Sequence, residues 1–211
     1  MREKLRDWIH RGFARERAVI ERWISRQAQG NAGPASLRVL ELGCGAGVLA
    51  GAFDPRCYRG IDSDAEAVAA ARRRYPEYDF RVGDLRSPET APLFREASTV
   101  VCHGVLHHLN DLELERLLAA IVEATSPGAS LLAIEPVLPP WTNPAGRLLA
   151  SRDRGAWIRP ATRLEELVAS SGLRLAESRR ISLWPRYPIS SQAYRFVKVR
   201  PGRQSVNGKD E

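Results

Sequence analysis

The chain has 211 residues, of which 44% are hydrophobic and 27% are charged, and its formal net charge is +7. These values are typical of one soluble globular domain, and no apolar run approaches the ~20 residues that a membrane span needs. The three cysteines are dispersed and form no C-x-x-C pair, so we expect neither a disulfide framework nor a zinc site, and a reducing cytoplasm as the compartment.

The positive charge is spread over the chain rather than gathered in a tract. Almost all basic residues are arginines that stand beside acids, and lysine occurs only at positions 4, 198 and 209. This pattern favours a solvated surface over a nucleic-acid-binding face. It leaves only a modest preference for anionic partners.

Residues 4–28 are the first predicted element, an amphipathic helix. Apolar side chains recur there at spacings of three and four, with Arg and Glu between them. We expect residues 1–30 to form a helical cap over the domain, with docking on a partner or a membrane as the alternative. The Gly, Asn and Pro residues of 29–36 end this pattern.

From Leu37 onward, short apolar runs alternate with helical stretches. The runs lie at 37–42, 57–61, 78–82, 98–102 and 129–134, and the helical stretches at 46–52, 64–74, 89–95 and 111–124. Alternation of this kind predicts a parallel β-sheet with helices on both faces.

After Glu135 the alternation stops. Residues 136–162 combine prolines, tryptophans and arginines, and we expect a lid-like insertion there. A helix over 162–171 follows, with Thr162 and Glu165 as a capping box. Two strands at 173–183 and 192–199 then pair antiparallel, and residues 201–211 form a disordered tail.

The segment "VLELGCGAG" (39–47) places a glycine-rich loop after the first strand. Gly43, Gly45 and Gly47 permit positive φ angles and let a ligand approach the backbone. The helix expected after the loop would present unpaired N–H groups. Glu41 would repel a pyrophosphate, which argues against a dinucleotide site.

Asp62 ends the second strand, 15 residues beyond Gly47. In a doubly wound sheet this position brings a carboxylate next to the glycine loop, where it can accept both hydroxyls of a ribose. The alternative is an N-cap of the next helix, a role that Ser63 or Asp64 fills equally well.

Five segments in order, "VLELGCGAG", "GIDSDAEAVAAAR", "FRVGDL", "VLHHL" and "SPGASLLAIEP", resemble the motifs of class I S-adenosylmethionine-dependent methyltransferases, in particular the bacterial small-molecule enzymes. The resemblance is close over 37–135 and loose over 160–199. It implies an α/β Rossmann-like doubly wound sheet of seven strands, in the order 3-2-1-4-5-7-6, with strand 7 antiparallel. We expect residues 1–200 to form this single domain.

The resemblance also implies a cofactor, S-adenosylmethionine, which is converted to S-adenosylhomocysteine. Asp62 matches the acid that binds the ribose hydroxyls, and Asp84 matches the residue that binds the adenine amino group. The fourth strand begins "ASTVV" where the family has an aspartate, so the methionine end of the cofactor is less well specified. The expected cofactor-binding residues are Glu41, Gly43, Cys44, Gly45, Asp62, Ser63, Asp84, Leu85, His103 and Gly104.

Methyl transfer is an in-line displacement in which the protein mainly supplies alignment and desolvation. The acceptor should lie where strands 4 and 5 end, beneath the insertion at 136–162. Our hypothesis is that one or two arginines there bind an acidic group on the acceptor, with a rigid loop of solvated arginines as the alternative. The expected substrate-binding residues are His107, Trp141, Arg147, Arg154 and Trp157.

Three of the four histidines lie in "VCHGVLHHLND" (101–111). Neighbouring His107 and His108 diverge too much to share a metal, and no cluster of Cys or acidic residues completes a ligand set. The pair is expected to shape the site. His103, at the end of the fourth strand, is the candidate catalytic base, with a packing or cofactor contact as the alternative.

These observations predict a methyltransferase that acts on a small-molecule acceptor as a monomer or homodimer. An acidic acceptor and one linked to a glycan or lipid are the classes that we consider for it. The alternatives are an RNA methyltransferase, suggested by the +7 charge, and a cofactor-binding partner subunit without activity. No nucleic-acid partner is expected, because the chain has no basic tract and no N-P-P-[YF] motif.

Overall fold

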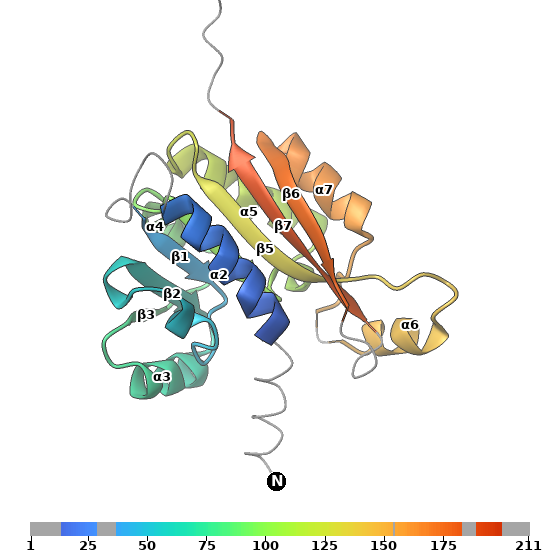
Figure 1. Cartoon of the computed structure of the whole chain (residues 1–211), viewed down its shortest axis with the longest axis horizontal. Helices are drawn as coiled ribbons and strands as arrows, with labels where there is room; N and C mark the ends of the chain where they lie inside the picture. Colours follow the sequence, from blue (N-terminus) through green and yellow to red (C-terminus); the bar gives the residue numbers. More distant parts are fainter. Residues whose placement is uncertain (1–13, 29–36, 154, 183–188, 200–211) are drawn as a thin grey trace, which may run out of the picture.

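The computed structural model describes residues 14–28, 37–153, 155–182 and 189–199. Their centre is a seven-stranded sheet in the order β3-β2-β1-β4-β5-β7-β6. Figure 1 shows β3, β2 and β1 on one side of β5, and β7 and β6 on the other. Strands β1 to β5 run parallel, and β7 pairs antiparallel with both β5 and β6. The predicted strand order and the antiparallel seventh strand are therefore confirmed. The strands are β1 (Val39–Leu42), β2 (Tyr58–Asp62), β3 (Asp79–Val82), β4 (Thr99–His103), β5 (Ser130–Val137), β6 (Leu173–Ile181) and β7 (Ser190–Lys198).

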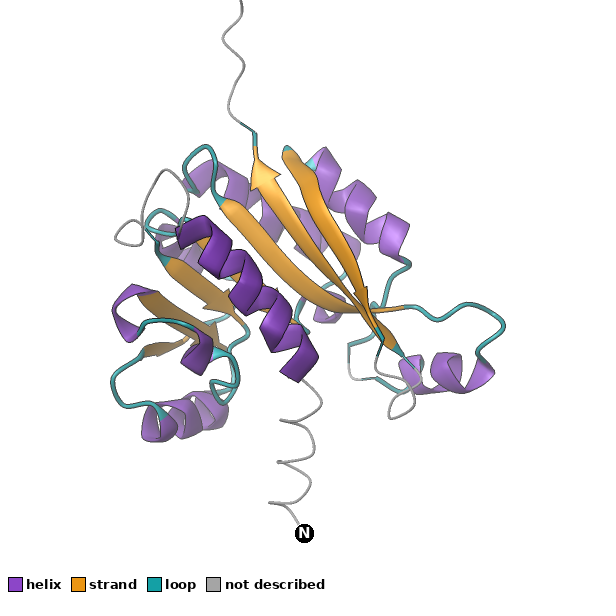
Figure 2. Ribbon diagram, viewed as in Figure 1, coloured by secondary structure: helices purple, strands orange, loops and turns teal. Residues whose placement is uncertain are grey.

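Helices cover both faces of the sheet (Figure 2). One face packs under α2 (Ala14–Ala28) and α3 (Ala65–Arg74), and the other under α4 (Ala91–Phe94), α5 (Asp111–Ala124) and α7 (Ala161–Ser170). The four residues of β1 are all buried. A fully buried strand between two helical layers has no polar face, which explains the continuous apolar runs in the sequence.

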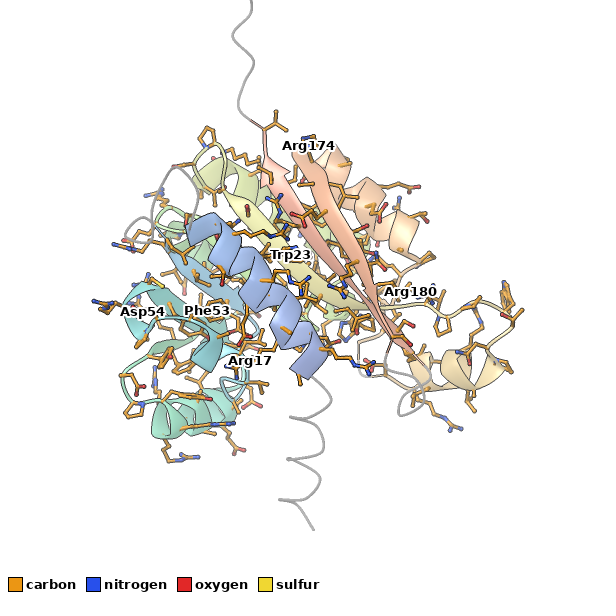
Figure 3. All side chains as sticks on the ribbon, viewed as in Figure 1. Arg17, Trp23, Phe53, Asp54, Arg174 and Arg180 are labelled. Carbon is orange, nitrogen blue, oxygen red and sulfur yellow. The ribbon has the colours of Figure 1, made fainter. Side chains whose placement is uncertain are left out.

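The N-terminal helix α2 lies across the front of the sheet in Figure 1. Its buried stripe consists of Val19, Ile20, Trp23 and Ile24. The Trp23 indole N–H donates to the Glu177 carboxylate on β6 over 3.0 Å, and Figure 3 shows Trp23 on the side of the helix that meets the sheet. The predicted helix of 4–28 is thus confirmed from residue 14, and its earlier part lies outside the described residues.

Helix α5 begins with a capping box that the sequence carries locally. The Asn110 side chain accepts the Glu113 backbone N–H over 2.9 Å, and the Glu113 carboxylate accepts the Asn110 N–H over the same distance. These two bonds satisfy N–H groups that a helix start leaves unpaired. They fix the point at which the chain leaves β4 and enters the next helix.

Two local predictions were wrong. No α-helix follows the glycine loop at 46–52; the chain forms turns and then a short 3₁₀ helix, Ala50–Ala52. The Thr162–Glu165 capping box does not form either, because α7 begins one residue earlier, after Pro160, with no side-chain cap. Proline fixes φ near the helical value and can start a helix without a side-chain partner.

The insertion at 136–162, the lid segment, contains a short helix of its own, α6 (Pro144–Ala150). In Figure 1 this helix lies beyond the end of the sheet, away from the two helical layers. Pro144 stands in the first turn of α6, and the Asn143 side chain accepts the Gly146 N–H over 2.9 Å. The predicted tail at 201–211 lies outside the described residues.

Candidate active site

The three glycines of the loop (residues 43–47) all have positive φ, at 67°, 50° and 73°, but they serve different purposes. A Cβ at Gly43 would lie 2.4 Å from the Val105 side chain, and a Cβ at Gly47 would lie 3.0 Å from Phe80. A Cβ at Gly45 would meet only the Asp62 carboxylate, at 4.0 Å. Gly43 and Gly47 are therefore needed for packing, whereas Gly45 faces open space.

The Asp62 carboxylate at the end of β2 holds this loop in place. Its Oδ2 accepts the Gly45 N–H over 2.7 Å, and its Oδ1 accepts the Asp64 N–H over 2.9 Å. Asp64 itself caps α3 by accepting the N–H groups of Glu66 and Ala67. The N-cap that stood as the alternative role for Asp62 is thus filled by Asp64.

Glu41 is buried on β1, with 2% of its surface exposed, and accepts the Tyr58 hydroxyl proton over 2.6 Å. Burial raises its pKa to about 7, against the lowering effects of the Tyr58 bond and of His103. Gly60 lies opposite Glu41 in the register. A Cβ at Gly60 would lie 2.7 Å from the Tyr58 hydroxyl, so this glycine makes room for the contact.

Asp84 and Leu85 follow β3, at the same edge of the sheet as Asp62. The Asp84 side chain is 44% exposed and forms an ion pair with Arg86 over 2.9 Å, and this hydrogen bond lowers its pKa. Leu85 packs against the hydrophobic core, and Ser63 is exposed beside Asp62. Gly104, at a φ of 65°, continues the same edge beyond β4.

His103 ends β4 and meets a residue from the far end of the sequence. Its Nε2 lies 2.8 Å from the Glu16 carboxylate on α2, and both side chains are largely buried, at 13% and 2% exposed. Burial lowers the pKa of His103, but the bond with Glu16 and the charges of Glu41 and Glu135 raise it above its ordinary value overall.

His107 is fixed by the buried carboxylate of Glu135. Glu135 accepts the backbone N–H groups of Val105 and Leu106 over 3.0 and 2.9 Å, and its other oxygen lies 2.8 Å from His107 Nδ1. A Cβ at Gly155 would lie 1.9 Å from the His107 ring, so the lid segment lies directly on this imidazole. His107 is therefore held between Glu135 and the lid segment.

The lid segment is fastened chiefly by Arg159. This guanidinium is 8% exposed; it pairs with Asp111 over 2.8 Å and donates to the carbonyls of Leu106, Leu109 and Trp157. It serves the fold and has few donors left for a ligand.

The remaining lid residues that were expected to bind the acceptor lie farther out. The Arg147 guanidinium stands 3.7 Å from the centre of the Trp141 ring and donates to the Pro139 carbonyl. Trp141 is 83% exposed and Trp157 is 48% exposed. Arg154 lies outside the described residues. A small hollow between the lid segment and the sheet is lined by His107, Glu135, Trp157 and Tyr194, among others.

Most of the expected cofactor residues therefore line one edge of the sheet, and Asp62 meets the glycine loop as predicted. The sequence reasoning missed three buried partners: Glu16, Tyr58 and Glu135. Glu16 carried a detectable signal, because it is an acid that falls on the apolar stripe of the helix, three and four residues before Val19 and Ile20.

Within the described residues, no group of three or more His, Cys, Asp or Glu side chains is arranged to hold a metal ion. None of the helices described is long and apolar enough to cross a membrane. The cysteines at 44, 57 and 102 all carry free thiols. Cys44 is buried within the glycine loop, and burial raises the pKa of its thiol.

Residues 39–128 match a family model described as a methyltransferase domain. No curated protein sequence matches the chain. Among solved structures, a SAM-dependent methyltransferase of Methanosarcina mazei is 17% identical, with 78% of this chain and 93% of that one covered and a TM-score of 0.65. Magnesium protoporphyrin IX methyltransferase of Synechocystis, solved with bound SAH, is 20% identical, with coverages of 89% and 84% and a TM-score of 0.67.

Human N-acetylserotonin methyltransferase, solved in complex with SAM, is 24% identical. The alignment covers 77% of this chain and 47% of the human one, with a TM-score of 0.57. At these identities the similarity establishes the fold, and the family match extends from β1 to the end of α5 and the turn before β5.

Proposed function

We propose that this chain, a methyltransferase of class I, transfers the methyl group of S-adenosylmethionine to a small-molecule acceptor. The observation that carries the proposal is the contact between Asp62 and the glycine loop, 2.7 Å from Oδ2 to the Gly45 N–H. This contact joins a carboxylate and an open backbone surface at the carboxyl ends of adjacent parallel strands. That edge is where open α/β sheets bind nucleoside-containing ligands.

The residues present fit the cofactor. Each oxygen of Asp62 accepts one backbone N–H, and a carboxylate has about four acceptor sites, so capacity remains for two ribose hydroxyls. Gly45 leaves the adjacent space open, since a side chain there would approach only Asp62. Asp84, whose side chain is 44% exposed, would accept from the adenine amino group. When bound, the cofactor supplies an activated methyl group on a positively charged sulfur.

The charge of the site suits that sulfur. Glu16, Glu41 and Glu135 are buried acids at or near the end of β4, each at most 3% exposed, and Asp62 adds a fourth carboxylate on β2. Buried acids stabilise a cation nearby more strongly than surface acids do, because solvent screens them less. We expect the methionine end of the cofactor, with its sulfonium, to lie among these groups.

The acceptor would lie beneath the lid segment, next to His103 and Gly104. His107, Trp141, Arg147, Arg154 and Trp157 remain our candidates for contacting it. Of these, Arg147 presents a cation on an exposed tryptophan face, which suits an acidic aromatic or amphipathic acceptor. Small-molecule acceptors of the two neighbours named for their substrates, a porphyrin and N-acetylserotonin, support this class.

His103 is our candidate for contact with the attacking atom of the acceptor. As a base, it would take a proton from an acceptor whose own pKa is high. An acceptor that is already anionic would need no base, and His103 would then only orient it. Substitution of His103 by Ala with undiminished turnover would exclude both roles.

Cofactor binding is tested by calorimetry with S-adenosylhomocysteine. Asp62→Asn removes a charged acceptor of hydrogen bonds, and we expect the dissociation constant for S-adenosylhomocysteine to increase about 10- to 100-fold. The matched control is Asp64→Asn, which is two residues away and remains a good N-cap, so its affinity should stay within about two-fold. Equal affinities of wild type and Asp62→Asn would contradict the proposed site.

Acceptor class is tested by incubating the protein with S-adenosylmethionine and separate pools of acidic small molecules, neutral small molecules and RNA. Mass spectrometry should find a product 14 mass units heavier in a small-molecule pool. Methylation of RNA alone would overturn the proposed acceptor class. Tight cofactor binding with no product in any pool would favour the partner-subunit alternative.

A further inference from the structure

The N-terminal helix brings an acid into the proposed methyl-transfer site. Glu16 lies on the buried stripe of α2, where the neighbouring positions 19, 20, 23 and 24 are all apolar. A carboxylate is costly to bury unless it is paired and hydrogen-bonded. The Glu16 side chain is 2% exposed, and its carboxylate lies 2.8 Å from Nε2 of His103. A position needed only for packing would be filled more favourably by an apolar residue.

The contact is fixed by how α2 docks. At the far end of the helix, the Gln27 amide bonds to the side chains of Thr99 on β4 and Ser130 on β5, over 2.8 and 2.6 Å. Gln27 and Glu16 are 11 residues apart, or about 16 Å along a helix. Thr99 and His103 span about 13 Å along β4. The helix therefore lies along β4 with a polar contact at each end and apolar side chains between.

We propose that Glu16 is a positioning residue of the methyl-transfer site, which holds the His103 imidazole at the end of β4 through a buried hydrogen bond, so that docking of α2 completes the site. The inference rests on the proposed function, because His103 has a chemical role only if methyl transfer occurs beside it. Glu16 itself need not touch the acceptor. Its hydrogen bond to Nε2 fixes the orientation of the His103 ring.

Other charged groups also face His103. Glu41 on β1 and Glu135 on β5 act on it through their charges, and Glu135 is already engaged by the amides of the β4–α5 turn and by His107. Glu41 is bonded to Tyr58. Of these three acids, Glu16 is the one in direct hydrogen-bonding contact with the ring. Its removal should therefore change His103 more than any other single substitution of these acids.

The first experiment is an NMR titration of the histidine side chains in wild type, Glu16→Gln and Glu21→Gln. The chain has only four histidines, and a His103→Gln variant assigns the relevant signal. Gln keeps the size of Glu16 but not its charge, so the titration midpoint of His103 should fall. Glu21 lies on the same helix, half exposed and paired with Arg17, and its substitution should leave the midpoint unchanged.

The second experiment follows turnover against pH with the same variants. In Glu16→Gln we expect kcat to fall about 10- to 100-fold and its pH profile to move toward lower pH, while the affinity for S-adenosylhomocysteine stays within about three-fold. Glu16→Asp keeps the charge on a shorter side chain and should restore part of both properties. It also serves if Glu16→Gln does not fold.

The outcomes separate this inference from the proposed function. An unchanged His103 midpoint in Glu16→Gln, or a turnover and pH profile equal to those of Glu21→Gln, would overturn the role of Glu16. A lowered midpoint in a protein that binds no cofactor would leave the Glu16–His103 contact established and overturn the proposed function instead.

Discussion

The glycine loop and the lid segment are each held in place by one charged side chain, and the two side chains carry opposite charges. A carboxylate, Asp62, holds the loop by accepting backbone N–H groups, whereas a guanidinium, Arg159, holds the lid segment by donating to three backbone carbonyls and to Asp111. Asp62 keeps acceptor capacity toward the open side of Gly45. Arg159 is 8% exposed, and most of its five donors are used.

This difference indicates which residues can serve a ligand. A side chain that fastens a segment and still has unused hydrogen-bonding capacity toward open space can do both, as Asp62 does. A side chain whose hydrogen-bonding groups are all used within the protein serves only the fold. Because Arg159 serves the fold, the hypothesis that lid arginines bind the acceptor is narrowed, among the described residues, to Arg147 and the exposed Arg152.

The largest expected effect is a difference in unfolding free energy between substitutions at two glycines of one loop. Gly43→Ala combines a positive φ with a Cβ that would lie 2.4 Å from Val105, and we expect the free energy of unfolding to fall by about 4 kcal/mol. Gly45→Ala has the positive φ but not the collision, and should lose about 1 to 2 kcal/mol. Urea unfolding measures both.

A measurement of cofactor affinity provides a second comparison of Gly43→Ala with Gly45→Ala. Gly45→Ala introduces a methyl group into the open space beside Asp62, so it should weaken the binding of S-adenosylhomocysteine although it unfolds less readily than Gly43→Ala. If Gly43→Ala proved the milder change for stability, the division of the loop into packing and ligand-facing glycines would be wrong.

The next largest effect is the change with pH in the contribution of Glu41 to stability. Its folded-state pKa of about 7 exceeds the value of 4.5 expected in the unfolded chain. Below pH 4.5 both states are protonated and there is no penalty. As pH rises from 4.5 to 7, the unfolded chain releases this proton first, so stability falls, by about 3 kcal/mol in total.

Glu41→Gln removes this titration while keeping the shape of the side chain. The unfolding free energy of Glu41→Gln minus that of wild type should therefore increase by about 3 kcal/mol between pH 4.5 and pH 8. Groups that do not interact with Glu41 titrate alike in both proteins and cancel from the difference. A difference that stays constant with pH would show that Glu41 is ionised in the folded protein throughout this range.

The smallest effect tests the fastening of the lid segment. Arg159→Ala leaves backbone carbonyls without their donor and should cost about 2 kcal/mol of stability. Arg163 pairs with the same Asp111 over 2.8 Å but is 48% exposed, so solvent screens the pair and Arg163→Ala should cost clearly less stability than Arg159→Ala. Thermal unfolding of the two variants measures the contrast, and equal costs would remove the distinction between a buried and a surface partner of Asp111.

The sequence predicted the sheet well because the signals for it are local. Buried runs such as Val39–Leu42 and the turn residues between them specify strand, loop and helix within a few residues, and the resemblance then supplied the strand order. The position of Asp62 beside the loop followed from the topology of parallel strands.

What the sequence did not predict depends on contacts between distant segments or on details of turns. Glu16 and His103 are separated by 87 positions, and the apolar periodicity of α2 reveals a buried face without revealing which strand end it meets. The expected helix after the glycine loop gave way to turns and a 3₁₀ helix, since Gly45 and Gly47 have positive φ angles that a right-handed helix does not accommodate. The role of Pro160 in starting α7 prevented the capping box at Thr162.

The Glu135 carboxylate has one more consequence. Three successive backbone N–H groups, those of Val105, Leu106 and His107, converge on it. Such a concave group of amides is a nest, which in other settings captures phosphate or another free anion. Here the nest is already occupied by the Glu135 carboxylate from β5. An added anion could bind at this turn only by displacing the Glu135 carboxylate from the three amides.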